Sequence, residues 1–441
     1  MRNNLLKISS FKLFSLFYFM ATSVLFSQQN EVKSLVNTSH LDHLYQQINV
    51  DGKEMGIIHI YSNYPDYKYT DAPGEGIACV DDIARADIFY MKYYEVSHDS
   101  SVYNKIKMLT NFLLYMQSDN GFFNNFIFGD YSKNTTYKTS VAEPNWWSWR
   151  AIWALGEANN FFLKYDKSFA AAISPQLEKA VKVTKKWLVK NESDSTQNFS
   201  GFKLPTWLPL GTAADQAAVI VKGFLSYYKA TNDTLVRNEA IRLCTGIEGM
   251  QAGDASYLPH YAFLSWQNTW HMWGNNQAEA LIDAGIMLNN LEYIKKAQKE
   301  IWDFYPYLIK ANYMSSFTIE HVKDTVVYKD STKFGQIAYG ISPMVLASCK
   351  SYNATKDVAS ATVAGLLGCW LFGKNPAGKP MYNIKTGVCF DGINNENEIN
   401  MNSGAESTIE ALFSMLAIDQ NPIAKKIVWN YYNEHIGANS K

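Results

Sequence analysis

The segment VDDIARADIFYMKYYEVSHD, residues 80–99, decides the fold, because segments of the same kind recur along the whole chain. It begins with two acidic residues after a loop and continues as an Ala-containing stretch whose apolar side chains have helical spacing. The recurrences start roughly 60 to 70 residues apart, which is the period of a repeat built from paired helices. They are WWSWRAIWALGEANNFFLKYD (146–166), ADQAAVIVKGFLSYYKATND (214–233), NQAEALIDAGIMLNN (276–290), GQIAYGISPMVLASCKSY (335–352) and GAESTIEALFSMLAI (404–418).

A second, more polar helix is expected between consecutive members of this set. The Ala-rich segments can pack closely on all sides and are expected inside, whereas the Lys- and Glu-bearing segments need only one buried face. Six inner helices alternating with about six outer ones predict an all-α fold, the (α/α)6 toroid. An open helical solenoid is the alternative, but it usually has shorter, more regular repeats and capped ends. The expected outer helices span residues 103–117, 176–190, 235–250, 290–309 and 356–372.

Strands are expected only in short pieces, around residues 56–61 and as a small hairpin around residues 317–328. Neither piece is long enough to form a domain of its own. Residues 1–27 are typical of an export signal, with Arg2, Lys7 and Lys12 ahead of an apolar stretch, residues 13–26. The mature chain is therefore predicted to begin near residue 28, to form one toroid domain over residues 28–441, and to act in the periplasm or outside the cell.

The composition excludes several classes of function. Forty basic and 41 acidic residues give a net charge of −1 without a basic run, which argues against nucleic acid as a partner. No later segment supplies the roughly twenty apolar residues of a membrane span. The five Cys residues are scattered without metal-ligand spacing, so zinc is disfavoured and buried thiols are favoured over disulfides. Neither a metal nor an organic cofactor is expected.

Acidic residues recur where the inner helices begin, and those starts should converge on one end of a toroid. Helix N-termini favour carboxylates, so each acid taken alone can be a helix cap. A cap needs no tryptophan, however, and the same loops are rich in that residue. The residues at the starts are Asp81, Asp82, Glu143, Asp215, Glu279, Gln336 and Glu406. The tryptophans are Trp146, Trp147, Trp149, Trp207, Trp266, Trp270 and Trp273.

Acids beside aromatic rings suit the cleavage of sugar bonds. That reaction needs one carboxylic acid to protonate the leaving oxygen and one carboxylate to activate water, while flat aromatic side chains stack on sugar faces. A serine nucleophile is disfavoured because no GxSxG is present. His260 and His271 flank an aromatic loop and can line such a cleft, although a lone histidine is more often structural.

The segment LFGKNPAGKPMYNIKTGVCFDGINNENEINMNSGAES, residues 371–407, is the most distinctive of the chain. Its run GKNPAGKP cannot continue a helix, so a long loop is expected across the mouth of the toroid before Glu406 opens the last inner helix. Long structured loops of this kind are commonly functional. Asp391 is a further acid in this loop, whereas Glu396 and Glu398 are interpreted as solvated.

LFGKNPAG (371–378) followed by NSGAESTIEAL (402–412) resembles the closing region of six-hairpin glycosidases, including inverting cellulases with an LG.NP-type loop before the last helix. GEGIACVDDIARA (74–86) and QSDNGFFNNFI (117–127) resemble the first hairpins of bacterial six-hairpin proteins associated with glycan degradation. The resemblance covers most of the chain as architecture but only these motifs as sequence. It implies a base at Asp81–Asp82, although the glycines of the cellulase motif differ. The implied acid is Glu398 by the cellulase pattern or Glu406 by the other.

The first hypothesis is therefore an exported glycoside hydrolase, of the inverting kind by its resemblance, acting on an oligo- or polysaccharide. Asp81 or Asp82 is the expected base and Glu406 or Glu143 the expected acid. A polysaccharide lyase, a sugar isomerase on the same toroid, and a non-catalytic glycan-binding protein remain alternatives. The expected substrate contacts are Trp146, Trp147, Arg150, Trp207, Asp215, His260, Trp270, His271, Trp273 and Asp391, with Arg85 and Arg150 also available to hold carboxylates ionised.

Overall fold

The computed structural model describes residues 34–189, 195–323 and 325–437, and the described residues from 36 onward form one compact unit. The predicted signal segment, residues 1–27, lies outside the described residues. Within the described part, helices dominate and the strands are short. No helix among the described residues is both long and apolar enough to cross a membrane.

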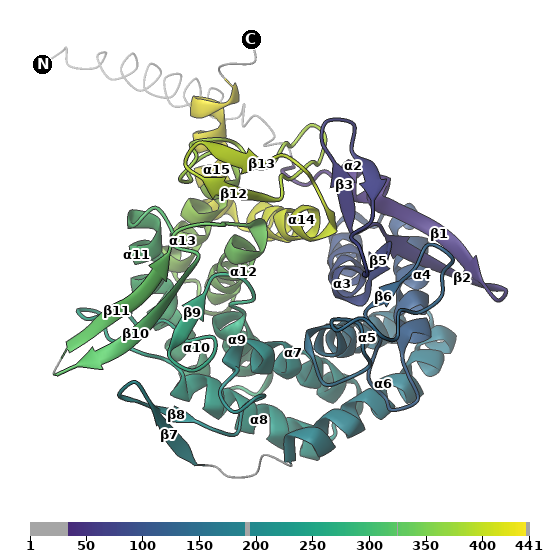
Figure 1. The fold of residues 1–441 in the computed structure, drawn as a ribbon, viewed down its shortest axis with the longest axis horizontal. Coiled ribbons are helices and arrows are strands. Elements are labelled where there is room, and N and C mark those ends of the chain that lie inside the picture. The colour runs from purple at the N-terminus through teal and green to yellow at the C-terminus, as the bar shows by residue number, and fades with distance from the viewer. Residues whose placement is uncertain (1–33, 190–194, 324, 438–441) are drawn as a thin grey trace, which may run out of the picture. The chain divides into compact units, whose positions relative to one another are not determined.

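Six helices of the described part form the inner layer of a closed ring (Figure 1). Each contacts the next one along the chain, and the last contacts the first, so the ring is closed and the open-solenoid alternative is wrong. Most residues of these helices are buried, as expected for elements packed on all sides. The inner helices are α3 (Val80–Ser97), α5 (Trp146–Tyr165), α7 (Ala214–Thr231), α9 (Gln277–Met287), α12 (Ala338–Thr355) and α14 (Ala405–Asp419).

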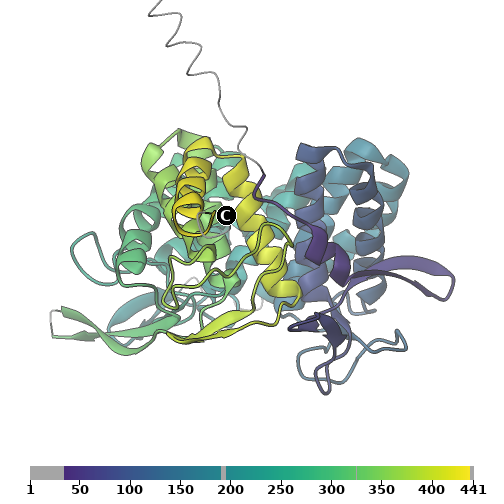
Figure 2. The same cartoon turned by 90° about the horizontal axis from the view of Figure 1, so that it is seen from above.

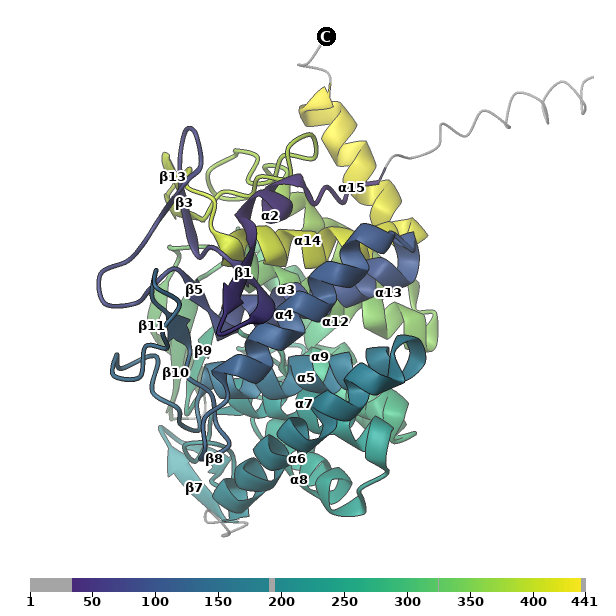
Figure 3. The same ribbon diagram turned by 90° about the vertical axis from the view of Figure 1, so that its right-hand side faces the viewer.

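The outer layer consists of helices that alternate with the inner ones in sequence and have one buried face; α4 and α6 run across the outside of the ring in Figure 3. The fourth outer element is interrupted by a π-helical turn, η1 (Glu300–Phe304), between α10 and α11. The predicted (α/α)6 toroid is therefore confirmed. The outer helices are α4 (Ser100–Met116), α6 (Lys167–Val189), α8 (Thr234–Gly249), α10 (Leu291–Lys299) with α11 (Tyr305–Lys310), α13 (Val358–Gly368) and α15 (Pro422–His435); a short 3-10 turn, η2 (Cys369–Leu371), follows α13.

A two-residue signature joins several inner helices to their outer partners. The inner helix ends on a residue in the left-handed region, and the next residue is an aspartate whose carboxylate caps the outer helix. This arrangement satisfies backbone groups at both helix ends within a tight turn. The pairs are His98–Asp99, Asn232–Asp233 and Lys356–Asp357.

Most strands gather at the end of the ring where the inner helices begin (Figure 2). The hairpin predicted around residues 317–328 is confirmed as β10 (Ser316–Val322) and β11 (Thr325–Thr332), to which β9 (Thr269–His271) adds a third strand. A short helix, α2 (Ser39–Leu44), precedes the first strand. The remaining antiparallel pairs are β1 (Tyr45–Val50) with β2 (Lys53–Ile58), β3 (Tyr61–Asn63) with β4 (Lys68–Thr70), β5 (Ala78–Cys79) with β6 (Phe126–Ile127), β7 (Thr196–Phe199) with β8 (Phe202–Pro205), and β12 (Gly392–Asn395) with β13 (Glu398–Asn400).

Buried ion pairs link the inner helices on the side of the ring formed by α7, α9 and α12. Glu279 of α9 binds Lys222 of α7 at 2.5 Å and Lys350 of α12 at 2.8 Å, and Lys350 also binds Asp283. Burial alone would raise the pKa of Glu279, but the two lysines hold it well below its usual range. Glu279, one of the acids predicted at the helix starts, therefore belongs to the packing of the ring. The five cysteines are buried and free, as the sequence favours.

We predict that Glu279→Gln lowers the free energy of unfolding by about 3–5 kcal/mol, because it leaves the buried Lys222 without its anionic partner. Chemical denaturation measures the loss. The control is Glu292→Gln, which removes the same charge from an exposed pair with Lys295. It should unfold like the wild type, and equal effects of the two changes would contradict this account of the ring.

Candidate functional site

A cleft opens where the first, second, fifth and last inner helices begin, and it consists of two adjoining cavities. The seam cavity, of about 260 Å³, lies between the starts of α3 and α14. The aromatic cavity, of about 390 Å³, extends to the start of α5. Residues lining both are Asp81, Asn125, Phe126, Ile337, Tyr339 and Glu406. The seam cavity adds Ile60, Tyr61, Glu75, Cys79, Asp82, Arg85, Ala338, Asp391, Gly404 and Ser407, and the aromatic cavity adds Thr139, Asn145, Trp146, Trp147, Arg150 and Trp273.

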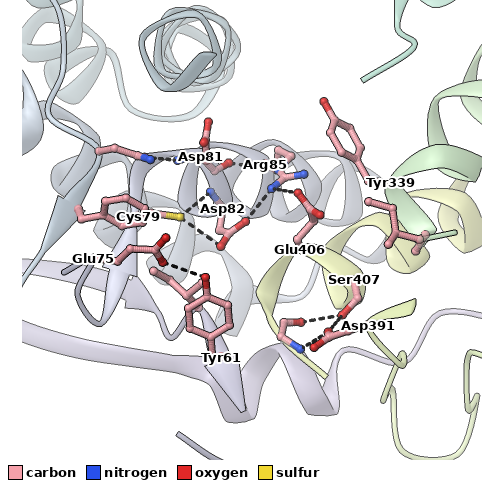
Figure 4. A pocket seen from close by; sticks show the side chains of 16 residues that line it. Tyr61, Glu75, Cys79, Asp81, Asp82, Arg85, Tyr339, Asp391, Glu406 and Ser407 are labelled. Atoms are coloured by element: carbon pink, nitrogen blue, oxygen red, sulfur yellow. Dashed lines mark hydrogen bonds and ion pairs between the residues drawn. The ribbon is translucent and has the colours of Figure 1, made fainter. Parts of the chain in front are cut away.

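The start of α3 is fixed by the small β5–β6 ladder and by a cysteine cap. Cys79 is the last residue of β5, and its sulfur accepts from the backbone N–H of Asp82 at 3.5 Å. The Cys79 thiol in turn donates to Asp82 Oδ2 at 3.2 Å. Asn125, which precedes β6, accepts from the backbone N–H of Asp81. The consecutive carboxylates of α3 are thus held in different settings, Asp82 inward and Asp81 toward the cleft (Figure 4).

Arg85, one turn into α3, binds three carboxylates. Its Nη2 donates to Asp82 at 2.7 Å and to Glu406 at 3.0 Å, and its Nη1 donates to Glu410 at 3.0 Å. Its Nε donates to the backbone oxygen of Asp81. The guanidinium is buried and therefore makes its bonds in a medium where they are strong. Since Glu406 and Glu410 belong to α14, Arg85 joins the first inner helix to the last.

The three carboxylates differ in exposure. The side chain of Glu406 is 44% exposed, whereas those of Asp82 and Glu410 are 5% and 4% exposed. Burial raises the pKa of Asp82 to about 6, although Arg85 opposes the shift and the nearby charge of Glu406 adds to it. Burial likewise raises the pKa of Glu410 against the opposing effect of Arg85. Glu406 is therefore the carboxylate of this cluster that solvent and a ligand can reach.

The start of α14 is set by Asp391 in the long loop. Asp391 Oδ1 accepts from the backbone N–H of Gly404 at 2.8 Å and from the Ser407 hydroxyl at 2.7 Å (Figure 4). A Cβ at Gly404 would lie 2.6 Å from the backbone oxygen of Ile60, so only glycine allows this approach. Asp391 lines the seam cavity, and it also positions Glu406 by capping the helix that carries it.

Asp81 is held from the opposite wall by α5. Arg150 Nη1 lies 2.5 Å from Asp81 Oδ1, and Arg150 Nη2 donates to the Tyr339 hydroxyl at 2.8 Å. The Arg150 guanidinium also lies 5.2 Å from the centre of the Trp146 ring. The Asp81 side chain remains 21% exposed, so one ion pair orients it without closing it off.

Trp273 lines the aromatic cavity and has a supported ring. His271 stacks on it with ring centres 4.1 Å apart and planes 11° apart, and His271 Nδ1 lies 2.7 Å from the Trp273 backbone oxygen. The other nitrogen of His271 lies 3.1 Å from Asp215. Because Trp273 is 42% exposed, one face is available while the histidine backs the other. Asp215 and His271 support the cleft rather than line the two cavities.

Two tryptophans predicted as sugar platforms are buried and have no open face. Trp270 is 1% exposed and packs against Phe304 and Phe317, so its prediction as a sugar platform is wrong. Trp147 is 3% exposed and borders the aromatic cavity without an open face; its indole N–H donates to two backbone oxygens. These rings are buried because strand β10 and the loop before α5 cover them, which the sequence pattern does not reveal.

Three more candidates lie outside both cavities. Glu143 accepts from the side chain of Asn145. The indole N–H of Trp207 donates to the backbone oxygen of Arg242, and the His260 ring packs against Tyr307. None of these three side chains lines the seam cavity or the aromatic cavity.

Tyr339, Glu75 and Asn125 line the seam cavity but were not found from the sequence. A signal for Tyr339 is present in the sequence, because this residue lies near the start of the fifth repeat, where Gln336 stands in place of the acid. Glu75 accepts from the Tyr61 hydroxyl at 2.8 Å, a pairing between two segments without a repeat signal. No cluster of three or more His, Cys, Asp or Glu side chains that could hold a metal ion occurs among the described residues.

No protein-family model matches the chain, and no curated protein matches it in sequence. Solved structures do match. A sugar epimerase from a ruminal bacterium is 11% identical with a TM-score of 0.56, over 90% of this chain and 98% of that one. Cellobiose 2-epimerase from Bacillus thermoamylovorans B4167 is 9% identical with a TM-score of 0.53, over 82% and 92%.

A D-mannose isomerase is 15% identical with a TM-score of 0.51, over 81% of this chain and 90% of that one. The chain is an (α/α)6 toroid. At these identities the likeness concerns the fold, and it confirms the six-hairpin architecture that the closing motifs resemble.

We predict that Asp82 makes stability depend on pH in a window between about 4 and 6. Its pKa is about 6 in the folded protein against 3.8 for a free aspartate side chain, so the folded state binds the proton more tightly. Asp82 therefore contributes on the order of 3 kcal/mol to the free energy of unfolding below pH 4, and this contribution is lost as the pH rises through 6. Unfolding of the wild type and of Asp82→Asn at several pH values isolates it. A difference between the two proteins that does not change with pH would contradict the assignment.

Proposed function

We propose that the cleft is the active site of a carbohydrate-processing enzyme that hydrolyses a glycosidic bond. One observation carries the proposal: Asp81 and Glu406 line both cavities, reach solvent, and are each bound to a buried arginine. A glycosidic bond lying between the two cavities would meet a carboxylate from α3 and another from α14. Trp146 and Trp273 offer aromatic surface beside them.

In this proposal Glu406 protonates the leaving oxygen and Asp81 activates the attacking water. Asp82 is a poor base because its oxygens already accept from Arg85 and Cys79. Asp82 Oδ1 and Glu406 Oε2 both accept from the same nitrogen, Arg85 Nη2, at 2.7 and 3.0 Å. These two carboxylates therefore lie close together. An inverting pair needs carboxyl groups roughly 6.5–9.5 Å apart to admit water. Asp81 with Glu406 is therefore the pair that we assign, and Asp82 serves to position Arg85.

Isomerisation or epimerisation of a sugar is the second candidate function. Its support is the likeness to the sugar epimerase and the D-mannose isomerase, and that likeness is one of fold. Such reactions move a proton next to a carbonyl and need a base of suitable pKa. His271, which is paired with Asp215 behind Trp273, is a histidine near the cleft, but it lines neither cavity. Hydrolysis remains the first proposal because the exposed carboxylates lie in the cleft itself.

The test is incubation of the protein with neutral oligosaccharides in ¹⁸O-labelled water, followed by mass spectrometry. Hydrolysis breaks the chain and places one ¹⁸O on the new reducing end. Isomerisation or epimerisation leaves the mass of the oligosaccharide unchanged, apart from oxygen exchange, and introduces deuterium when run in heavy water. Asp81→Asn and Glu406→Gln should each lower kcat/KM by a factor of about 10²–10⁴. Because Asp81→Asn also leaves the buried Arg150 without its anionic partner, both variants are assayed at a temperature where circular dichroism shows them fully folded.

Matched controls separate loss of chemistry from loss of charge. Asp66→Asn and Glu178→Gln make the same substitutions in exposed ion pairs, with Lys68 at the start of β4 and with Lys182 on α6. Both should retain wild-type turnover. Hydrolysis that survives in Asp81→Asn and Glu406→Gln would contradict the assignment.

A further inference from the structure

The seam cavity is walled on the side where the ring closes. The backbone N–H of Ala405 donates to Ile60 at 2.9 Å, and that of Ser403 donates to Ser62 at 3.1 Å. The Ser62 hydroxyl adds a bond to the Ser403 backbone oxygen at 2.6 Å. These bonds attach the chain around β3 to the start of α14. A sugar chain cannot pass through a wall made of paired backbone.

Side chains complete this wall. Tyr61 and Glu75 bind each other at 2.8 Å, and both line the seam cavity opposite the α14 start (Figure 4). Tyr61 is only partly buried and Ser62 is fully buried, so the wall is packed from behind. His40, from α2, bonds to the Ser403 backbone oxygen and supports the same segment.

The aromatic cavity differs in lining and in position. It continues from Asp81 and Glu406 away from the seam, toward Trp146 and Trp273. Trp273 is 42% exposed, and its ring is backed by His271, which holds it as a flat surface. The cleft thus has one walled polar end and one aromatic end, with the two assigned carboxylates at the junction.

The seam cavity is also small, and its lining is rich in negatively charged side chains. Its volume of about 260 Å³ lies below the ~300–1,000 Å³ usual for pockets that hold drug-sized ligands. Five carboxylates line it against a single arginine, Arg85. An anionic sugar would face repulsion from these groups. The lining carboxylates are Glu75, Asp81, Asp82, Asp391 and Glu406.

We infer that the protein is exo-acting and removes one uncharged sugar at a time from the non-reducing end of a glycan, an inference that rests on the proposed function. The terminal sugar occupies the seam cavity, and the rest of the glycan extends along Trp146 and Trp273. Water adds its oxygen to C1 of the terminal sugar while the bond from C1 to the leaving oxygen breaks. Asp81 takes the proton from that water, and Glu406 gives its proton to the leaving oxygen.

The test uses linear gluco-, manno-, galacto- and xylo-oligosaccharides of two to six units, labelled with a fluorophore at the reducing end. Exo action yields a labelled product shortened by one unit first, then by two, in strict order. Cyclic glucans without ends, and oligosaccharides capped by a uronic acid at the non-reducing end, should not be cleaved. Trp273→Ala should raise KM by roughly two- to tenfold for the longer oligosaccharides and by less for a disaccharide, whose second ring extends only toward Trp273.

The control is Trp266→Ala, which removes an equally exposed tryptophan, 44% against 42%, that lines neither cavity. Its KM values should match those of the wild type. Early labelled fragments of intermediate length, or cleavage of the cyclic glucans, would overturn exo action while leaving hydrolysis by Asp81 and Glu406 intact. An absence of turnover over the whole panel, or turnover that survives in Asp81→Asn, would overturn the proposed function and this inference with it.

Discussion

The bonds of Arg85 are the constraint on which the rest of the site depends. A six-hairpin ring has one junction, between α3 and α14, that chain connectivity does not provide, and Arg85 spans it with bonds to Asp82, Glu406 and Glu410. Two of these carboxylates are almost fully buried. Without the guanidinium they would be unpaired charges in a medium of low dielectric, a state that costs several kcal/mol. Arg85 therefore both joins the first and last inner helices and compensates the charge of their buried carboxylates.

The bonds of Arg85 also explain why the site lies at the seam. Arg85 binds Glu410 within the buried packing of the ring. Glu406, one turn earlier on α14, also binds Arg85 but lies at the surface of the cleft. Below the cleft, Arg85, Arg150 and Lys222 fill the ring around a void of only about 10 Å³. A further cavity, of about 280 Å³, lies beyond this packing, and Lys350 and Glu279 are among the residues that line it. The toroid is thus a filled ring with a cleft at one end, and not a pore.

The sequence predicted the ring well because its signals are periodic. Inner and outer helices differ in composition, and the acids at the starts of α3 and α14 must be neighbours once the ring closes. Individual rings and acids were harder to place. Trp270 and Trp273 belong to the same aromatic segment of the sequence. The pairing of β9 with β10 nevertheless buries Trp270, whereas Trp273 stays open. Glu279 opens an inner helix as Glu406 does, but two lysines from neighbouring helices draw it into the packing. Contacts between distant segments decide both cases, and no local pattern encodes them.

The most direct test of the account is a crystal structure of Glu406→Gln with a neutral oligosaccharide bound. The account predicts a sugar ring in the seam cavity against the wall formed by Tyr61 and Glu75. The next ring should lie toward Trp273, with the linking oxygen beside residue 406 and with Arg85 still bound to Asp82 and Glu410. Sugar bound only in the cavity beside Lys350, or a linking oxygen remote from both Asp81 and residue 406, would contradict it.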